Sequence, residues 1–419
     1  MRDTPLRMTT PSRARTITTL GTAQTLAWAS SYYLPAVLAA PMARDLGVAT
    51  PTVFAAFSLA LIVSALVGPW SGRVIDRSGG RPLLMATNAV FALGLLVLGT
   101  AQGPLMLFVA WVLIGVAMGS GLYEAAFATL VRLYGSESRN AITGITLIAG
   151  FASTVGWPLS TLLETQIGWR GACFAWAGLH LVLGLPLNAS LPKRASLAEP
   201  GPTVQGEPGM DSAEAGAEST PAPAALSLPR PVFTTAVLAS VFAVTWFVST
   251  AMASHLPTLL QAAGAPLATA VAVGALVGPA QVAGRLLEFG FLRRVHPLLA
   301  ARLAALGHPL GVASLLIAGA PAAALFAVLH GAGNGMLTIA KGTLPLVLFG
   351  AQGYGARQGW LMMPARVAQA FAPFLFGVVL EQWGARALWL SAALGVSAFV
   401  GLMLLPRAAP PDTTAAVKA

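Results

Sequence analysis

Three ionisable residues lie inside long apolar runs of this chain. Glu124, Lys341 and Arg366 have mainly apolar neighbours, in a sequence of which only 9% is charged. A charge in such a run is costly unless it faces a cavity or a partner, so each residue is a functional candidate. Lys341 and Arg366 suit a carboxylate ligand, Arg as a planar fork and Lys as a point charge. Glu124 suits proton uptake, because burial favours the protonated form of a carboxyl group, whereas a nearby cation favours its ionised form.

A short polar segment between two apolar runs is the second constellation. Residues 72–81 read GRVIDRSGGR, and residues 284–288 repeat the Gly-Arg-apolar-apolar-acid spacing as GRLLE. A carboxylate at a helix end, such as Asp76, is stabilised when it lies against the N-terminus of another helix. The repeat also indicates a duplicated unit with one polar hinge in each half.

Several weaker signals complete the candidate set. Trp28 and Tyr32 are four residues apart, so they share a helix face on which a ligand stacks or on which they merely pack. His255 stands just before a Leu-Pro pair, as Tyr33 does in the first half, and is a candidate for proton movement. Asn334 lies among glycines, where it can hydrogen-bond a ligand or a neighbouring helix. The other three histidines within runs are expected to pack or to lie at helix ends: His180, His308 and His330.

The composition indicates a helical membrane protein. The chain has 419 residues, 56% of them hydrophobic, with a mean hydropathy of +0.75, whereas a soluble domain carries roughly 25% charged residues. Lipid leaves backbone groups to satisfy one another, so apolar runs without alternation are expected to be helices rather than barrel strands. The net charge of +10 comes from basic residues between the runs, which argues against nucleic acid as a partner.

Cysteine usage and motifs argue against a metal centre, a cofactor site or an enzyme. Cys173 is the single cysteine, which excludes an intramolecular disulfide and a cysteine metal cluster. The sequence contains no nucleotide-binding loop, metal-ligand spacing or nucleophile motif above chance. We therefore expect a protein without cofactors.

Twelve runs are long enough to cross about 30 Å of hydrocarbon at about 1.5 Å per residue. The first half is expected to form a six-helix bundle over 18–191 and the second another over 231–406. Between them, residues 192–230 are rich in Pro, Ala, Gly, Ser and Glu and are expected to be a disordered linker. The tails are 1–17 and 407–419. The runs are 18–42, 52–72, 83–101, 105–132, 141–163, 170–191, 232–260, 267–290, 297–319, 321–347, 358–380 and 386–406.

The distribution of Lys and Arg predicts the orientation. With the N-terminus inside, most basic residues fall in inside segments, and only Arg44, Arg170 and Arg386 fall outside. The positive-inside rule then places both termini and the linker in the cytoplasm. The arginine-rich start followed by a long apolar run is expected to be an uncleaved first span rather than a signal peptide.

Small and helix-bending residues repeat between the halves. The glycines let helices approach closely, and the prolines bend them, which suits gating. An even number of spans in each half gives both halves the same orientation, related by an axis along the membrane normal. The matched residues are Gly115 and Gly119 with Gly331 and Gly335, and Pro158 with Pro373.

The polar segment at 72–81 resembles the signature of the major facilitator superfamily between its second and third spans. The match rests on Gly72, Asp76, Arg77, Gly79 and Arg81, and the usual second basic residue is Pro82 here. The resemblance implies a twelve-helix, monomeric secondary transporter in the bacterial inner membrane. Within the superfamily, the chain is similar to monocarboxylate transporters and the oxalate/formate exchanger. The similarity rests on residues 28–35 of the first span, on Gly168-Trp169-Arg170 before span 6, and on the basic residues of spans 8, 10 and 11.

The resemblance gives the polar hinge a role as a cytoplasmic gate. Asp76 would lie against the start of span 11, near Gln358, and Arg77 and Arg81 would pair across the same contact, unless they are only topology anchors. The second copy keeps Glu288 but lacks the Gly-x-Arg tail, so the gate is expected to be asymmetric. Arg285 is either a substrate arginine, as in monocarboxylate relatives, or part of this second hinge, pairing with Glu288; we favour the hinge.

The resemblance also implies that spans 1, 4, 7 and 10 line a central cavity. Glu124 and Lys341, nine residues after Gly115 and ten after Gly331, would have similar depths and face each other across it. They would bind substrate and protons, or form a structural ion pair that never meets substrate. We expect proton-coupled transport of a small organic anion such as a monocarboxylate. The alternatives are proton-driven efflux of amphipathic drug-like compounds and, from another class, a membrane sensor without transport.

Overall fold

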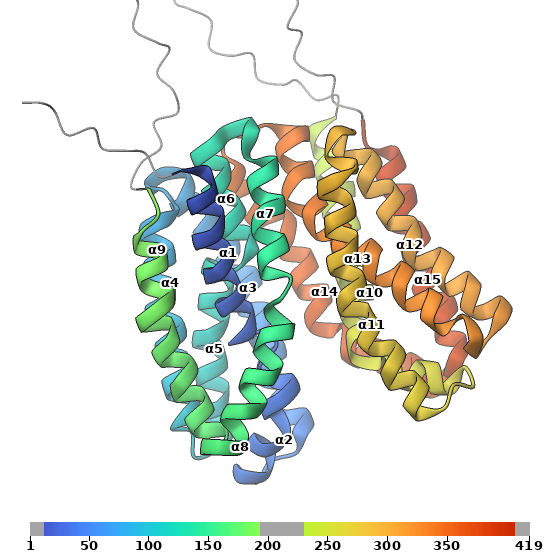
Figure 1. The fold of residues 1–419 in the computed structure, drawn as a ribbon, viewed down its shortest axis with the longest axis horizontal. Helices are drawn as coiled ribbons and strands as arrows, with labels where there is room; N and C mark the ends of the chain where they lie inside the picture. The colour runs from blue at the N-terminus through green and yellow to red at the C-terminus, as the bar shows by residue number, and fades with distance from the viewer. Residues whose placement is uncertain (1–11, 193–229, 407–419) are drawn as a thin grey trace, which may run out of the picture.

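The computed structural model describes residues 12–192 and 230–406, which form helices joined by short turns (Figure 1). The expected linker and the tail 407–419 fall almost wholly outside the described residues, as does the N-terminal tail up to residue 11, whereas residues 13–17 already belong to the first helix. The first half contains α1 Arg13–Ala29, α2 Pro35–Asp45, α3 Thr50–Ser78, α4 Gly80–Gly99, α5 Pro104–Gly121, α6 Tyr123–Tyr134, α7 Arg139–Ala149, α8 Ala152–Leu179 and α9 Leu185–Ala189. The second half contains α10 Pro231–Ala262, α11 Leu267–Gly290, α12 Pro297–Ala318, α13 Ala323–Phe349, α14 Tyr354–Trp383 and α15 Ala387–Leu404.

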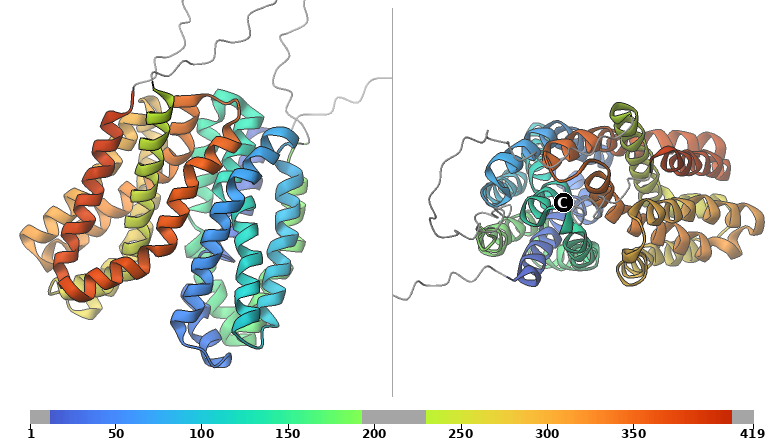
Figure 2. Two further views of the ribbon diagram at one scale, coloured as in Figure 1. Left: turned by 180° about the vertical axis from the view of Figure 1, so that it is seen from behind. Right: turned by 90° about the horizontal axis from the view of Figure 1, so that it is seen from above.

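The helices α1 to α9 gather on one side of the molecule and α10 to α15 on the other, as the colour gradient shows from front and back (Figures 1 and 2). The ribbons of the two groups lie close together at the end where α6, α7 and α13 are seen, and they diverge toward the opposite end. Asp76, near the end of α3, contacts the start of α14 at the close end. We call this the Asp76 end.

Seven helical stretches in the described part of the chain are long and apolar enough to cross a membrane. Two of them, Pro104–Ala189 and Tyr354–Leu404, run through kinks or turns and so contain several of the helices named above. In the second half, α10 to α15 coincide with the predicted apolar runs to within a few residues, because each run there is one uninterrupted helix.

The first half is more broken than its sequence predicts. The expected continuous run 18–42 divides into α1 and α2, with a turn that carries Tyr32 and Tyr33. The hydroxyls of Ser30 and Ser31 donate hydrogen bonds to backbone carbonyls one turn earlier, at 2.8 and 2.6 Å. Pro35 then begins α2. Hydroxyls that bond the backbone compete with helix propagation, which explains the interruption.

The expected run 105–132 also divides, into α5 and α6. Leu122 is extended, with φ −82° and ψ −164°, directly after the poor helix formers Gly119, Ser120 and Gly121. Glu124 therefore lies in the first turn of a new helix. The expected continuous run 105–132 was wrong at this point, because no continuous helix joins Gly115 to Glu124. The π-helical turn His180–Gly184 and the left-handed Gly168 (φ 73°) interrupt the later part of this half in the same way.

The contact between α3 and α14 depends on glycines from both helices. A Cβ at Gly72 would overlap the backbone of Gly355, and a Cβ at Gly355 would lie 2.5 Å from the carbonyl oxygen of Gly72. One turn further along, a Cβ at Gly359 would lie 2.5 Å from the Cα of Pro69. Small residues at matching positions let two helix backbones touch. We call this contact the α3–α14 seam.

The repeated glycines of the two halves make equivalent contacts. A Cβ at Gly115 or Gly119 would lie 2.6 or 2.7 Å from a backbone oxygen of α3. A Cβ at Gly331 would lie 2.7 Å from a backbone oxygen of α11, and one at Gly335 would overlap the same helix. The glycines therefore hold α5 against α3 and α13 against α11, as two copies of one packing arrangement.

Gly72→Ala is expected to open the α3–α14 seam, because the added methyl has no space against the backbone of Gly355. Inserting a methyl into a fully packed site costs about 1–3 kcal/mol, so the thermal midpoint of the purified protein should fall by several degrees. Gly178→Ala, in the helix interior of α8, is the matched control, since no atom lies within 4 Å of its Cβ position. An unchanged midpoint in Gly72→Ala would contradict the packing described.

Candidate functional site

An ion pair joins the two groups of helices at the centre of the molecule. The Arg366 Nη2 atom, on α14, donates to both Glu124 carboxylate oxygens, at 3.0 and 2.9 Å. The side chains are 5% and 15% exposed. Glu124 also gains from its place in the first turn of α6, where the helix dipole stabilises a negative charge.

A short hydrogen-bond chain extends the pair to the turn between α1 and α2. The Arg366 Nη1 atom donates to the side-chain oxygen of Gln369, at 3.0 Å. The Gln369 amide nitrogen then donates to the Tyr32 hydroxyl, at 2.9 Å. Opening the molecule at this point would therefore break a connected set of polar contacts rather than a single one.

Lys341 lies beside this network without joining it. Its side chain is only 3% exposed, and its ammonium makes no hydrogen bond. Its nitrogen lies 4.0 Å from the ring centroid of Trp246, a cation–π contact. The alternative of a structural Glu124–Lys341 ion pair is not realised, because the helix break before α6 brings Glu124 to Arg366 instead. Glu124, Arg366 and Lys341 in their ionised forms together carry one excess positive charge.

Aromatic rings from both halves surround the cations. Trp28 of α1 and Trp246 of α10 are almost parallel, at 6°, with centroids 6.4 Å apart. The guanidinium carbon of Arg366 is 5.8 Å from the first ring and 5.3 Å from the second. Tyr32 and Tyr123 border Trp28, with centroid separations of 5.2 and 4.9 Å. The candidate site is therefore a cation cluster in an aromatic shell, and we call it the central site.

At the Asp76 end, the carboxylate of Asp76 accepts the first free backbone N–H groups of α14. Its two oxygens accept from Gly355 N and Ala356 N, both at 2.8 Å. The contact falls just before Gln358, the residue near which we expected it. Arg132 donates to the backbone carbonyls of Asp76 and Arg77 and so caps the end of α3. The four ion pairs within the described residues include neither Arg77 nor Arg81, so their expected pairing across the seam is not made.

The second copy of the hinge makes a different contact. Glu288 accepts from the Arg139 Nη2 atom, at 3.0 Å, and Arg139 begins α7 in the other half. Arg139 also donates to the carbonyls of Leu292 and Val295, at 3.2 and 3.0 Å. The expected Arg285–Glu288 pair was wrong, because Arg139 takes this carboxylate.

Arg285 itself is 5% exposed and lies against the turn between α7 and α8. A Cβ at Gly150 would overlap its guanidinium, so it packs tightly against that backbone. Its Nε atom makes no hydrogen bond. The hinge copies therefore differ: Asp76 binds helix N–H groups, whereas Glu288 binds an arginine side chain.

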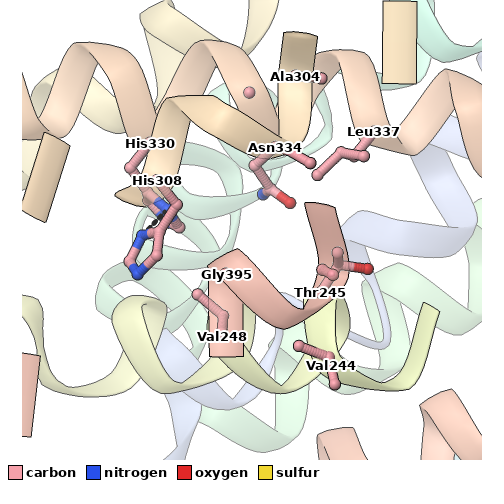
Figure 3. Close-up of a pocket in the computed structure, with 12 residues that line it drawn as sticks. Val244, Thr245, Val248, Ala304, His308, His330, Asn334, Leu337 and Gly395 are labelled. Atoms are coloured by element: carbon pink, nitrogen blue, oxygen red, sulfur yellow. Dashed lines mark hydrogen bonds between the residues drawn. The ribbon is translucent and has the colours of Figure 1, made fainter. Parts of the chain in front are cut away.

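Asn334 lies outside the central site. With Thr245, His308 and His330, it lines a separate cavity of about 30 Å³ among α10, α12, α13 and α15 (Figure 3). The two histidines contact each other through their Nδ1 atoms, 3.0 Å apart. This volume holds at most one or two waters, so the cavity is too small for an organic substrate.

The remaining predicted residues, His255 and Tyr33, lie at the edge of the central site or outside it. The His255 Nε2 atom, on α10, lies 2.7 Å from the carbonyl of Pro373 on α14, away from the cations. Tyr33 contacts Trp28 and also Trp157 on α8, with centroids 6.3 and 5.8 Å apart. No group of three or more His, Cys, Asp or Glu side chains suited to a metal occurs in the described part of the chain.

Sequence reasoning missed several side chains of these contacts, among them Trp246, Gln369 and Arg139. Gln369 had a readable signal, because a polar residue three positions after Arg366 shares its helix face. Trp246 lies in one of the expected cavity-lining spans, but its pairing with Trp28 comes from the other half of the chain and leaves no local pattern. Arg139 was counted only as a basic residue between runs.

The fold and the central site define a helical membrane protein with a cluster of charged and aromatic side chains between two groups of helices. Residues 20–336 match the sequence profile of the Major Facilitator Superfamily. Because this match covers most of the chain, the protein belongs to that superfamily.

Individual relatives are more distant. The chain is 27% identical over 177 residues to "Transcription regulatory protein OpdE" of Pseudomonas aeruginosa, covering 41% of this chain and 43% of the relative. It is 27% identical over 148 residues to "Multidrug resistance protein MdtL" of Klebsiella pneumoniae, covering 34% and 37%. The matches thus span less than half the length of these relatives. The solved structure of the human organic anion transporter MFSD10 is similar in fold, with a TM-score of 0.64, 16% identity, and coverage of 94% of this chain and 100% of that one.

Asp76→Asn is expected to weaken the contact with α14, because it removes the charge that the helix N-terminus stabilises by up to about 2 kcal/mol. The Gly355 and Ala356 amides should then exchange hydrogen about tenfold faster, as measured by mass spectrometry. Asp45→Asn is the matched control, since Asp45 binds Trp169 and Arg170 elsewhere. Unchanged exchange in Asp76→Asn would contradict the gate.

Lys341→Met and Arg366→Met are expected to change stability in opposite directions. The first removes a buried charge that has no acceptor, so the thermal midpoint without ligand should rise, consistent with gains of about 1–4 kcal/mol when buried charges become apolar. The second leaves Glu124 buried without its partner, which costs about 3–5 kcal/mol. Thermal unfolding in detergent measures both. A fall in the midpoint of Lys341→Met would show that this ammonium has a partner after all.

Proposed function

We propose that this transporter moves a small organic anion, such as a monocarboxylate, together with a proton by alternating access. The observation that carries the proposal is the buried Lys341 ammonium without an acceptor. Desolvating a cation costs several kcal/mol unless a partner compensates it. A carboxylate beside Lys341 would supply that partner and cancel the excess positive charge of the central site.

Glu124 and Arg366 supply the coupling. When Glu124 takes up a proton, its attraction for Arg366 is lost and the guanidinium becomes free. Arg366 is planar and presents its donors as a fork that fits a carboxylate. A protonated Glu124 therefore favours anion binding by Lys341 and Arg366 together. Release of the anion and the proton restores the ion pair. Proton and anion thus bind and leave as a set.

The proposed architecture is twelve spans in two six-helix bundles, 18–191 and 231–406, related by an axis along the membrane normal, with 192–230 as a linker. The equivalent glycine contacts of α5 on α3 and of α13 on α11 support this duplication. The two hinge contacts support it too, since each joins the end of one helix to the start of another in the opposite half. Pro158 and Pro373 lie inside α8 and α14, where they would allow bending.

We further propose that the Asp76 end faces the cytoplasm of a bacterium, in its inner membrane, and that the protein acts as a monomer. The arginines near the ends of α3 and α6, Arg73, Arg77 and Arg132, support this orientation. In this proposal, the contacts of Asp76 with α14 and of Glu288 with Arg139 form the closed cytoplasmic gate.

Efflux of amphipathic drug-like compounds by proton antiport is the second candidate. The naming of the Klebsiella pneumoniae relative as a multidrug resistance protein favours it, and the aromatic shell of the central site would suit such compounds. Here Glu124 would carry the proton and Lys341 would not contact substrate. A sensor without transport is a third candidate, favoured by the relative named as a transcription regulatory protein.

The test is uptake of radiolabelled anions into proteoliposomes under an imposed pH gradient. Wild-type protein should accumulate the anion when the outside is acidic, because protons drive its entry. Glu124→Gln should abolish the dependence on the gradient while still binding the anion, and Lys341→Met should bind it at least tenfold more weakly. Arg386→Met, at the turn before α15, is a control that removes a cation outside the central site.

Three outcomes separate the candidates. Anion accumulation that follows the gradient and requires Lys341 supports the proposal. A cationic or neutral ligand whose binding survives Lys341→Met, with transport driven by protons in the opposite direction, supports efflux instead. Ligand binding without any transport in proteoliposomes supports the sensor and contradicts both transport schemes.

A further inference from the structure

We propose that the transported anion carries a planar aromatic ring, so that the substrate class is an aromatic monocarboxylate. This inference rests on the proposed function and deepens it. Its observation is the pair of tryptophans, Trp28 and Trp246, which come from opposite halves and lie nearly parallel beside the cations.

The hydrogen-bond donors that lack a partner in the central site indicate the charged part of such a ligand. The indole N–H groups of Trp28 and Trp246 are buried and make no hydrogen bond. The same holds for the Lys341 ammonium. Buried tryptophans usually find a partner for this group, and buried polar groups left unpaired are costly. The three groups only donate, so a carboxylate, which only accepts, is the complementary ligand.

The indole rings of the two tryptophans indicate the apolar part of the ligand. In the described state the face of Trp246 is covered by the Lys341 ammonium, at 4.0 Å, which serves as the resting partner of that cation. When a carboxylate draws the ammonium away, the ring face becomes free. A planar ring attached to that carboxylate can then pack on it, in the offset or edge-on arrangement that aromatic pairs prefer.

The position of the two tryptophans on different halves links ring binding to transport. Trp28 and Trp246 are 3% and 9% exposed, so the described state is closed around them. Alternating access separates the halves and therefore the two rings. An aromatic substrate would rejoin them by contacting both, whereas an aliphatic acid of the same charge would leave the ring faces poorly covered. Ring contacts of this kind typically contribute three- to tenfold in affinity, roughly.

The experiment compares two anions of the same size and charge, benzoate and cyclohexanecarboxylate, which differ in the planarity of the ring. Their binding to the purified full-length protein is measured by isothermal titration calorimetry. We expect wild-type protein to bind benzoate about tenfold more tightly. Trp246→Leu and Trp28→Leu should reduce this ratio to about one, and Trp246→Phe should retain most of it. Because the ratio is taken within one variant, a partial loss of folded protein does not alter it.

Trp389→Leu is the matched control, since this tryptophan is 63% exposed on α15 and lies outside the central site. Its benzoate preference should equal that of the wild type. Equal affinity of the wild type for both acids, with both lost in Lys341→Met, would overturn the aromatic inference and leave the proposed anion transport standing. If neither acid binds, the aromatic inference is overturned. If the neutral analogue benzamide binds as tightly as benzoate and does so without Lys341, the proposed anion transport is overturned as well.

Discussion

The charge balance at the centre of the molecule is the constraint on which the remaining structure depends. Glu124 compensates Arg366 directly, across the contact between α6 and α14, and nothing among the described residues accepts a hydrogen bond from Lys341. A membrane interior penalises such a charge, and we propose that a ligand compensates it. Because the ion pair joins both halves, we propose that protonation of Glu124 or arrival of an anion changes the contact between the halves.

The contact between α3 and α14 at the Asp76 end is the second interaction that joins the two groups of helices. There α3 and α14 are in backbone contact through Gly72 and Gly355, and the Asp76 carboxylate binds the N–H groups that begin α14. The same helix, α14, carries Arg366 further along. A movement of α14 therefore alters the central site and the gate together. Because one helix contributes to both, we propose that α14 couples occupancy of the site to opening of the gate.

The sequence predicted the helical class and the second-half helices closely, because long uninterrupted apolar runs have few alternatives in lipid. It predicted the carboxylate of Asp76 at the start of α14 to within a few residues. It failed where local chemistry interrupts a run, at Ser30–Ser31 and at Gly119–Gly121, and so it misjudged Glu124. The partners of Glu124, Lys341 and Glu288 also differed from expectation, since ion pairing across the halves depends on side-chain directions that helical periodicity does not contain.

The claim that Lys341 holds an anion can be tested most directly by nitrogen-15 NMR of the lysine side chains. The chain has only three lysines, Lys193, Lys341 and Lys418, so selective labelling gives three ammonium signals, and Lys341→Met identifies the one that matters. Titration with benzoate should move the Lys341 signal alone and to saturation, with the same affinity as in calorimetry. A saturable benzoate titration in which the Lys341 signal stays fixed would contradict the account.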